Sequence, residues 1–326
     1  MDAAARKGAK RVLVFGATGT IGRAAVRALI ARGHTALCIV RRPVEAHAFP
    51  GAQIRIADPG DRATLERVAA QDGPVDAAVA CLASRTGLPA DAWAVDYGAN
   101  LNALGAARAA GVGHFILLSA ICVQRPRLEF QRAKLAFESA LIESGVDYSI
   151  VRPTAFFKSL SGQVDRVRRG KPFLIFGDGR ATACKPISDA DLAEYLVDCL
   201  DQTTYRNRIL PIGGPGPALS PREMGEGLFR LLGRPVRFRS VPMGLIDAIA
   251  GGLGLAARFV PTLAAKAELA RIGRYYASES MLVYDTAAGR YDADATPSTG
   301  RETLFDFYAK LIAGTVKLDR GAHAVF

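Results

Sequence analysis

Short β-rich runs alternate with longer helical segments through the first half of the chain, and this alternation constrains the fold more than any other feature. The expected strands occupy residues 11–15, 36–40, 53–57, 76–82, 114–118 and 147–151, and the expected helices occupy 21–31, 62–70, 93–110 and 128–143. Several helices end at a glycine that suits a helix C-terminus: Gly33, Gly111 and Gly145. Alternation of this kind predicts an α/β fold with a Rossmann-type doubly wound parallel sheet.

The regular alternation ends after Arg152 and Pro153. Two Pro- and Gly-rich stretches, GKPFLIFGDG and LPIGGPGPALSP, separate shorter elements beyond this point. Residues 188–200 still predict a helix against the sheet, because Ser188 can cap it. We expect residues 1–155, completed by about 187–215, to form the sheet domain, and residues 156–186 and 216–326 to form a smaller, interleaved C-terminal lobe.

The composition fits a folded chain with an anionic partner. Of 326 residues, 50% are hydrophobic, enough for a substantial core, and this excludes disorder and small disulfide scaffolds. The net charge of +11 suggests an anionic ligand, an acidic surface or anionic lipid headgroups. The longest run without Asp, Glu, Lys or Arg, residues 109–124, is shorter than the roughly 20 apolar residues that a membrane helix needs, so we expect no membrane span.

The cysteines and histidines argue against a metal centre. The five cysteines contain no CxxC pair, and His34, His47, His114 and His323 are isolated from one another. An odd, scattered cysteine count fits a reducing compartment. The N-terminal sequence MDAAARKGAKRVLVFG has no apolar signal core and no long Ser- and Arg-rich transit segment. We therefore expect a cytoplasmic chain that holds no metal.

A glycine-rich loop follows the first expected strand. VLVF runs into GATGTIG, a GxxGxxG spacing found in short-chain dehydrogenase/reductases, and an apolar helix follows. The amides at the start of this helix can face a pyrophosphate, so the loop predicts a dinucleotide site. A tight turn without ligand is the alternative. The expected cofactor contacts from this loop are Gly16, Thr18, Gly19, Thr20, Ile21 and Gly22.

The second expected strand ends in two basic residues. About 20 positions beyond the glycines, dinucleotide-binding folds place the residue that contacts the adenosine ribose, and it is acidic for NAD. Arg41 and Arg42 occupy these positions, and guanidinium groups favour a 2′-phosphate. The sequence therefore predicts NADPH, with two solvated surface arginines as the alternative. Asp58, just after the third expected strand, is a further expected cofactor contact.

The expected catalytic positions are Ser119, Phe130 and Lys134. Phe130 and Lys134 lie four residues apart on one helix face, in the pattern FxxxK instead of YxxxK. A tyrosine at the first position could protonate a carbonyl oxygen while the lysine holds the nicotinamide ribose, but a phenyl ring has no proton to donate. Three alternatives follow: reduction of a carbon–carbon double bond, a lysine-centred variant, or nucleotide binding without catalysis.

Four further segments carry a specific resemblance. They are LLSAICVQRPRLEFQRAKLAFESAL, SIVRPTAFFKSLSGQV, FGDGRATACKPISDADLAEY and LPIGGPGPALSPREMGE. With these and the C-terminal stretch ESMLVYDTAAGRYDADATPSTG, nearly the whole chain resembles the NADPH-dependent divinyl chlorophyllide 8-vinyl-reductases, a family of atypical short-chain dehydrogenase/reductases.

This resemblance implies hydride transfer from NADPH to the C8 vinyl group of divinyl chlorophyllide or divinyl protochlorophyllide, which gives an ethyl group. The conjugated macrocycle can delocalise the negative charge that hydride addition leaves, so no phenol is needed beside an oxyanion. A proton must still reach the adjacent carbon, and Lys134, Cys122 or a water molecule could supply it. Our hypothesis makes Lys134 the ribose anchor and a proton relay.

The resemblance also places residues around the reacting groups. Pro153 and Thr154 match positions near the nicotinamide in extended members of the superfamily. Two aromatic rings and a lysine follow, suited to a flat pigment and its propionate, with core packing and solvated lysines as the alternatives. The expected substrate contacts are Cys122, Phe156, Phe157 and Lys158, with Lys185 as a second basic candidate.

The sequence allows alternatives for one apolar segment and for the function of the whole chain. Residues 243–257, MGLIDAIAGGLGLAA, predict a core helix, a wall of the pigment pocket or a contact with the photosynthetic membrane. The other candidate functions are a related reductase of another conjugated aromatic or quinone-like substrate, and an NADP(H)-sensing regulator without catalysis. We expect no nucleic-acid partner, because the basic residues are dispersed and no nucleic-acid motif is present.

Overall fold

Seven parallel strands form the central sheet, in the order β3-β2-β1-β4-β5-β6-β8. The computed structural model describes residues 8–71, 73–257 and 259–316. Every predicted strand is present, and the strand order is that of a doubly wound nucleotide-binding fold, so the predicted fold class is confirmed. The strands are β1 Arg11–Phe15, β2 Thr35–Val40, β3 Gln53–Ile56, β4 Ala77–Ala80, β5 His114–Leu118, β6 Asp147–Pro153 and β8 Arg208–Ile212.

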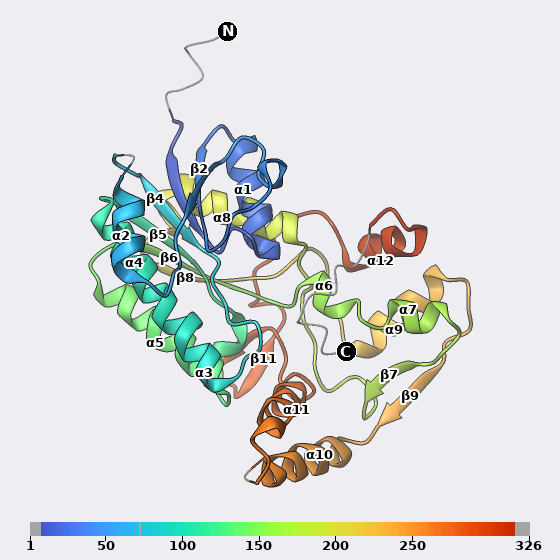
Figure 1. Ribbon diagram of the computed structural model, residues 1–326. Coiled ribbons are helices and arrows are strands. Elements are labelled where there is room, and N and C mark those ends of the chain that lie inside the picture. The colour runs from blue at the N-terminus through green and yellow to red at the C-terminus, as the bar shows by residue number, and fades with distance from the viewer. Residues whose placement is uncertain (1–7, 72, 258, 317–326) are drawn as a thin grey trace.

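Helices cover both faces of this sheet (Figure 1). One face packs against α1 (Thr20–Ala31) and α8 (Asp189–Asp201), whose apolar residues share a core with β1 and β2. The other face packs against α2 (Arg62–Ala70), α4 (Asn100–Ala109) and α5 (Glu129–Glu143). Strands buried on both faces are mostly apolar, so β1 after Arg11 and the whole of β4 are continuous hydrophobic runs.

The segment predicted as one helix over residues 93–110 differs from that prediction. It begins with α3 (Pro89–Ala92), continues as a π-helix, η3 (Trp93–Ala99), and only then becomes α4. The Asn100 side-chain amide donates to the carbonyl oxygens of Val95 and Asp96, which satisfies backbone groups in the widened turn. Hydrophobic periodicity does not reveal a π-helix, although such turns are frequent at functional sites.

A second core lies beside the sheet and includes Phe157, Phe173, Leu228 and Tyr308. We name the elements around it the smaller lobe; in it, β7 and β9 pair in parallel. Its elements are α6 Phe157–Leu160, α7 Val164–Arg168, β7 Phe173–Phe176, α9 Pro221–Leu231, β9 Phe238–Val241 and α12 Leu304–Ala313.

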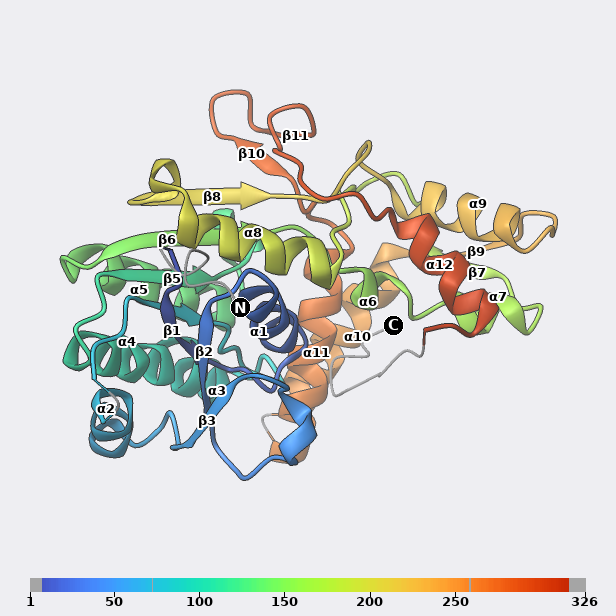
Figure 2. The ribbon, with the colours of Figure 1, turned by 90° about the horizontal axis from the view of Figure 1, so that it is seen from above.

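The remaining elements adjoin these two cores. Figures 1 and 2 place α10 (Met243–Ala256) and α11 (Ala264–Tyr276) beyond the carboxyl ends of the parallel strands, where doubly wound folds bind their ligands. Strands β10 (Val283–Asp285) and β11 (Arg290–Asp292) form an antiparallel hairpin. The short helices are η2 Ala46–Ala48, η4 Ile121–Gln124, η5 Thr203–Tyr205 and η6 Pro261–Leu263.

Candidate active site

The glycine loop between β1 and α1 leaves no room for side chains at two of its positions. Gly16 has a φ of +76°, and a Cβ there would lie 2.7 Å from the Cys81 carbonyl group. A Cβ on Gly22 would lie 2.1 Å from the Gly16 carbonyl oxygen. Gly19 caps α1 without a side-chain hydrogen bond, so the first amides of the helix are available to an anion. This cradle fits a pyrophosphate.

Arg41 and Arg42 follow β2 at the same edge of the sheet, and both are exposed. Neither forms an ion pair with any residue that the structure describes, so both guanidinium groups are available to a phosphate. Asp58 is exposed just beyond β3, where its carboxylate accepts a hydrogen bond of 2.8 Å from the amide of Gly60. The loop and the two arginines together fit NADPH.

Lys134 projects from α5 and forms an ion pair of 2.9 Å with Asp96 of the π-helix. The Asp96 side chain is 1% exposed, so the lysine charge is fixed by a carboxylate that water hardly reaches. The buried Oδ1 of Asn100 has no hydrogen-bond partner among the described residues. These groups lie together with Leu117, Leu118, Ser119 and Phe137 around a space too narrow for a water molecule. No local motif pointed to Asp96 or Asn100, because the π-helix brings them to Lys134.

Ser119 belongs to a buried polar network. Its hydroxyl donates to Glu138, which is 2% exposed, and Arg152 donates to the same carboxylate through Nε at 3.1 Å. The serine proton is therefore engaged by a carboxylate. Ser119 still borders the same narrow space as Lys134, where it can position neighbouring groups.

Phe130 lies in an apolar cluster between α5 and α11. It is 9% exposed and shares this cluster with Cys122, Ile272 and Tyr275, and Tyr276 packs against them. The Tyr276 hydroxyl lies 3.9 Å from the Cys122 sulfur, within hydrogen-bond range for a thiol. Burial raises the pKa of both groups above their ordinary values, so both are protonated near neutral pH. Sequence reasoning did not find Tyr276, which lies far from the catalytic helix along the chain.

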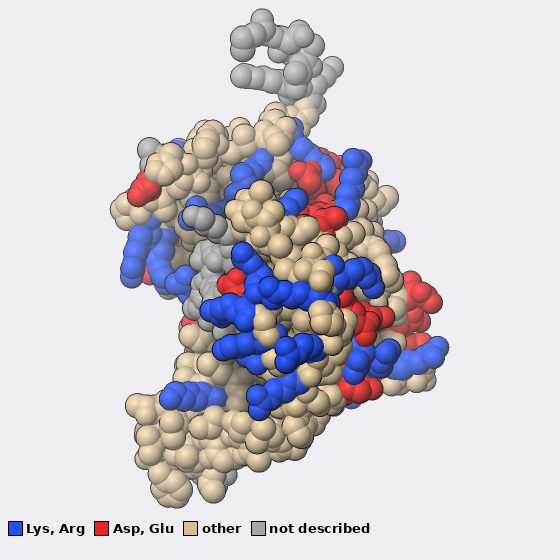
Figure 3. Space-filling model, turned by 90° about the vertical axis from the view of Figure 1, so that its right-hand side faces the viewer, with Lys and Arg blue, Asp and Glu red and all other residues tan. Residues whose placement is uncertain are grey.

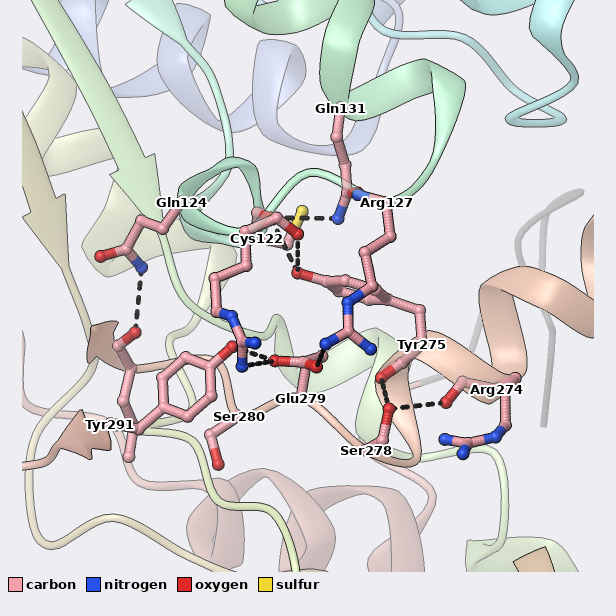
Figure 4. Close-up of polar contacts among 12 residues, drawn as sticks. Cys122, Gln124, Arg127, Gln131, Arg274, Tyr275, Ser278, Glu279, Ser280 and Tyr291 are labelled. Atoms are coloured by element: carbon pink, nitrogen blue, oxygen red, sulfur yellow. Dashed lines mark hydrogen bonds and ion pairs between the residues drawn. The ribbon is translucent and has the colours of Figure 1, made fainter. Parts of the chain in front are cut away.

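A polar network holds α11 against η4, the turn that follows β5 (Figure 4). The Tyr275 hydroxyl donates to the Cys122 carbonyl oxygen at 2.9 Å, and Gln131 donates to the same oxygen at 3.0 Å. Glu279 is buried and pairs with Arg125 and Arg127, each at 2.9 Å. The position of Tyr276 relative to Cys122 is therefore fixed by several bonds across segments that are distant in sequence.

Comparison with known proteins agrees with this geometry. Residues 16–203 match the NAD(P)H-binding protein family. The chain is 47% identical to the chloroplastic divinyl chlorophyllide a 8-vinyl-reductase of Cucumis sativus, over 97% of this chain and 79% of that protein. It is 49% identical to the protein of that name from Zea mays, over 97% of this chain and 82% of that protein. The chain belongs to the divinyl chlorophyllide a 8-vinyl-reductase family.

As a member of the 8-vinyl-reductase family, the chain is an oxidoreductase that uses NADPH. Its fold is shared with a solved NADPH-dependent quinone oxidoreductase from Escherichia coli complexed with NADPH. The TM-score is 0.67 at 18% identity, and the match covers 92% of this chain and 99% of that one. This second likeness concerns the fold alone.

In this 8-vinyl-reductase family member, the expected substrate contacts Phe156, Phe157 and Lys158 differ in burial and in their neighbours. Phe157 is 2% exposed and its ring packs 5.5 Å from that of Phe307, so it belongs to the core of the smaller lobe, as the packing alternative predicted. Phe156 is partly buried and packs against the sheet core. Lys158 Nζ lies 3.5 Å from Thr20 Oγ1, at the start of α1. This places Lys158 beside the cofactor loop, where its charge suits a phosphate.

Two further expectations concern the carboxyl end of β6. Pro153 ends the strand, and Thr154 is 2% exposed, with its amide bonded to the Ile212 carbonyl oxygen at 2.9 Å. The Thr154 hydroxyl donates to the carbonyl oxygen of Lys185. The Lys185 ammonium donates to the Thr296 carbonyl oxygen at 2.8 Å, so this lysine is engaged within the chain.

The sequence predicts no metal centre, because its histidines and cysteines are scattered. Within residues 8–316, apart from 72 and 258, no group of three or more His, Cys, Asp or Glu side chains is arranged to hold an ion. His114 is buried at the start of β5, and His47 is exposed. His323 lies outside the described residues.

Proposed function

We propose that the chain reduces the C8 vinyl group of divinyl chlorophyllide or divinyl protochlorophyllide to an ethyl group with NADPH. The observation that carries this proposal is that α5 presents a lysine fixed by Asp96 at position 134 but a phenyl ring, with no proton to donate, at position 130. Carbonyl reduction needs an acid at the developing oxyanion, whereas a conjugated macrocycle delocalises the charge itself. The names of the relatives support the same substrate.

The chain's own residues hold the cofactor and orient it. The α1 amides and Lys158 suit the pyrophosphate, and Arg41 and Arg42 suit the 2′-phosphate. Asp96 fixes the ammonium group of Lys134, which suits the hydroxyls of the nicotinamide ribose. When bound, NADPH supplies a hydride. Thr154 and Pro153 border the same edge of the sheet and support the nicotinamide side of the site.

Anaerobic incubation of the purified chain with 3,8-divinyl chlorophyllide tests this proposal. With NADPH, we expect a shift of the Soret band and a gain of two hydrogens in the pigment mass, and with NADH a much slower change. An unchanged pigment, with NADPH still bound to the protein, would refute the proposed reaction. That result would favour another conjugated or quinone-like substrate, or an NADP(H) sensor.

We also propose that the sheet domain comprises residues 1–155 and about 187–215, and that residues 156–186 and 216–326 supply the substrate lobe. The separate core around Phe173 and Leu228 supports this division. In the described residues, α11 and the β10–β11 hairpin depart from it in part, because both contact the loop after β5.

A further part of the proposed function is contact with an anionic membrane surface. No helix of the described residues is long and apolar enough to cross a bilayer. Helix α10 has no buried residue, and Leu245, Ile249 and Leu255 are 52%, 48% and 59% exposed. Phe259, just beyond it, is 80% exposed. An apolar helix with this exposure suits the interfacial region of a bilayer.

The charge next to α10 matches anionic headgroups. Figure 3 shows Lys and Arg side chains gathered on one face, above an uncharged lower end where Figure 1 places α10. Arg234 joins two elements of this face by donating to the Val167 carbonyl oxygen at 2.9 Å. The exposed basic residues of α7, α9, β9 and the loops after α7 and α9 are Arg168, Arg169, Lys171, Arg230, Arg234, Arg237 and Arg239.

Vesicle sedimentation tests this contact. We expect the chain to bind vesicles of phosphatidylglycerol and phosphatidylcholine, and to bind pure phosphatidylcholine weakly. Leu245→Ser with Ile249→Ser should reduce binding about tenfold, because two half-exposed apolar side chains no longer enter the bilayer. Ile142→Ser, on the distant helix α5, is the matched control, since Ile142 is 42% exposed. Equal binding by all three proteins would refute the contact.

A further inference from the structure

The side chain of Tyr276, at the end of α11, packs against the apolar cluster that contains Phe130 of α5. Position 130 on α5 carries a phenyl ring, but the apolar cluster around it receives Tyr276 from the end of α11. Tyr276 is the residue of this cluster whose hydroxyl donates to the Cys122 thiol. Tyr276 thus brings a hydroxyl group to this cluster beside Cys122, and not at position 130, from a helix more than a hundred positions further along the chain.

The Tyr276 hydroxyl lies near the lysine end of the site. Cys122 belongs to η4, directly after β5, and the positive charge of Lys134 acts on its thiol. The bond from Tyr275 to the Cys122 carbonyl oxygen and the second bond to the Arg125 carbonyl oxygen, at 3.3 Å, fix the end of α11 against this turn. Tyr276 therefore approaches the carboxyl ends of the strands, where a ligand lies in such folds.

The two other proton donors at this site, Ser119 and Lys134, are both engaged by strong acceptors. Ser119 donates to the buried carboxylate of Glu138, and the ammonium group of Lys134 pairs with Asp96. The Tyr276 hydroxyl instead donates to a sulfur atom, which is a weak acceptor. A bond to a weak acceptor is exchanged for another acceptor at little cost, so of the three groups this hydroxyl is the one most easily redirected toward a substrate atom.

We propose that Tyr276 is the proton donor of the reduction, an inference that rests on the proposed function. The vinyl π bond breaks as its terminal carbon accepts the hydride of NADPH, and the electron pair passes to the inner carbon and the macrocycle. The Tyr276 O–H bond then breaks, and its proton forms the second C–H bond, leaving NADP⁺ and a phenolate. The phenolate regains a proton from water.

The protonation state of Tyr276 supports this role. Burial raises the pKa of Tyr276 well above its ordinary value, so the group is a phenol over the whole physiological pH range. A phenol in an apolar cluster is a weak acid, and a weak acid is sufficient for a carbanion. It also loses no proton to solvent before hydride transfer.

The variant Tyr276→Phe tests the proposal, with Tyr148→Phe on β6 as the matched control. Removal of a general acid lowers turnover by about 100-fold or more. We expect this loss in Tyr276→Phe, with the affinities for NADPH and divinyl chlorophyllide kept within about twofold of those of the unsubstituted chain, and full turnover in Tyr148→Phe. Near-normal turnover in Tyr276→Phe, or loss of pigment binding in place of turnover, would overturn the role.

A second readout does not depend on turnover. Alkylation of Cys122 in the cofactor-free protein, followed by mass spectrometry, should be slower in Tyr276→Phe, because the hydroxyl that donates to the sulfur and lowers the pKa of the thiol is then absent. An unchanged alkylation rate would show that the hydroxyl does not contact the thiol and would overturn the geometry. No pigment reduction by the unsubstituted chain would refute the proposed function, a result distinct from a loss confined to Tyr276→Phe.

Discussion

At the scale of single residues, the ion pair between Lys134 and Asp96 bears on both the stability of the fold and the proposed function. The carboxylate is 1% exposed, and the lysine side chain is 13% exposed. A buried charge is costly without its partner, so each residue keeps the other in place. The same pair fixes the ammonium group where we propose that it holds the cofactor ribose.

Lys134→Met should lower the free energy of unfolding by about 3 kcal/mol, because it leaves the Asp96 carboxylate buried without a cation. Adding Asp96→Asn should restore most of this stability, since the amide carries no charge. Turnover should stay low in both variants if Lys134 acts on the cofactor. Urea unfolding and pigment reduction, measured on the same preparations, separate the two effects. Recovery of turnover in the double variant would contradict the role of Lys134.

Arg41→Ala combined with Arg42→Ala should weaken NADPH binding by roughly 10- to 100-fold, because hydrogen bonds to charged groups contribute about 1.5–3 kcal/mol. Binding of NADH, which has no 2′-phosphate, should hardly change. Fluorescence titration with both cofactors measures this difference. Arg108→Ala, an exposed arginine on α4, is the control. An equal loss for NADPH and NADH would show that the arginines do not recognise the 2′-phosphate.

At the scale of elements, a buried histidine links β5 to β6. His114 Nε2 lies 2.9 Å from Ser149 Oγ, and that hydroxyl donates to the Tyr205 carbonyl oxygen, so the ring donates to the serine. Its Nδ1 has no partner among the described residues. Burial, with a contribution from Arg206, lowers the pKa of His114 to about 4. The neutral ring is therefore the form that the folded sheet accommodates.

The free energy of unfolding should fall as the pH drops from about 6.5 to about 4, because in this window the unfolded chain binds a proton at His114 that the folded chain does not. The difference between the two pKa values corresponds to about 3 kcal/mol. His114→Gln keeps a donor for Ser149 and should remove this component, whereas His47→Gln, at an exposed site, should retain it. Identical pH profiles for both variants would contradict the assignment.

Elements with a periodic pattern could be predicted from the sequence, and elements that depend on tertiary contacts could not. The strands of the sheet and the glycine at the end of α1, Gly33 with a φ of +81°, follow from local patterns. The π-helix over Trp93–Ala99 does not, because its widened turn is satisfied by the Asn100 side chain. Asp96 was missed for this reason.

At the scale of the whole molecule, the site combines segments that are far apart in sequence. The loop after β5, helix α5 and the end of α11 meet around Cys122, and Glu279 binds Arg125 and Arg127 across the same junction (Figure 4). The FxxxK pattern revealed which hydroxyl is absent from α5. The location of Tyr276 depends on how α11 packs, and no pattern within its own segment indicates that.

Direct hydride transfer to the pigment is the central claim, and isotopic labelling tests it most directly. Divinyl chlorophyllide would be reduced anaerobically with each of the two epimers of NADPH deuterated at C4, and the product analysed by mass spectrometry. The account predicts one deuterium in the new ethyl group with one epimer and none with the other. A reduced pigment without deuterium from either epimer would contradict the account, because the hydrogen would then come from another source.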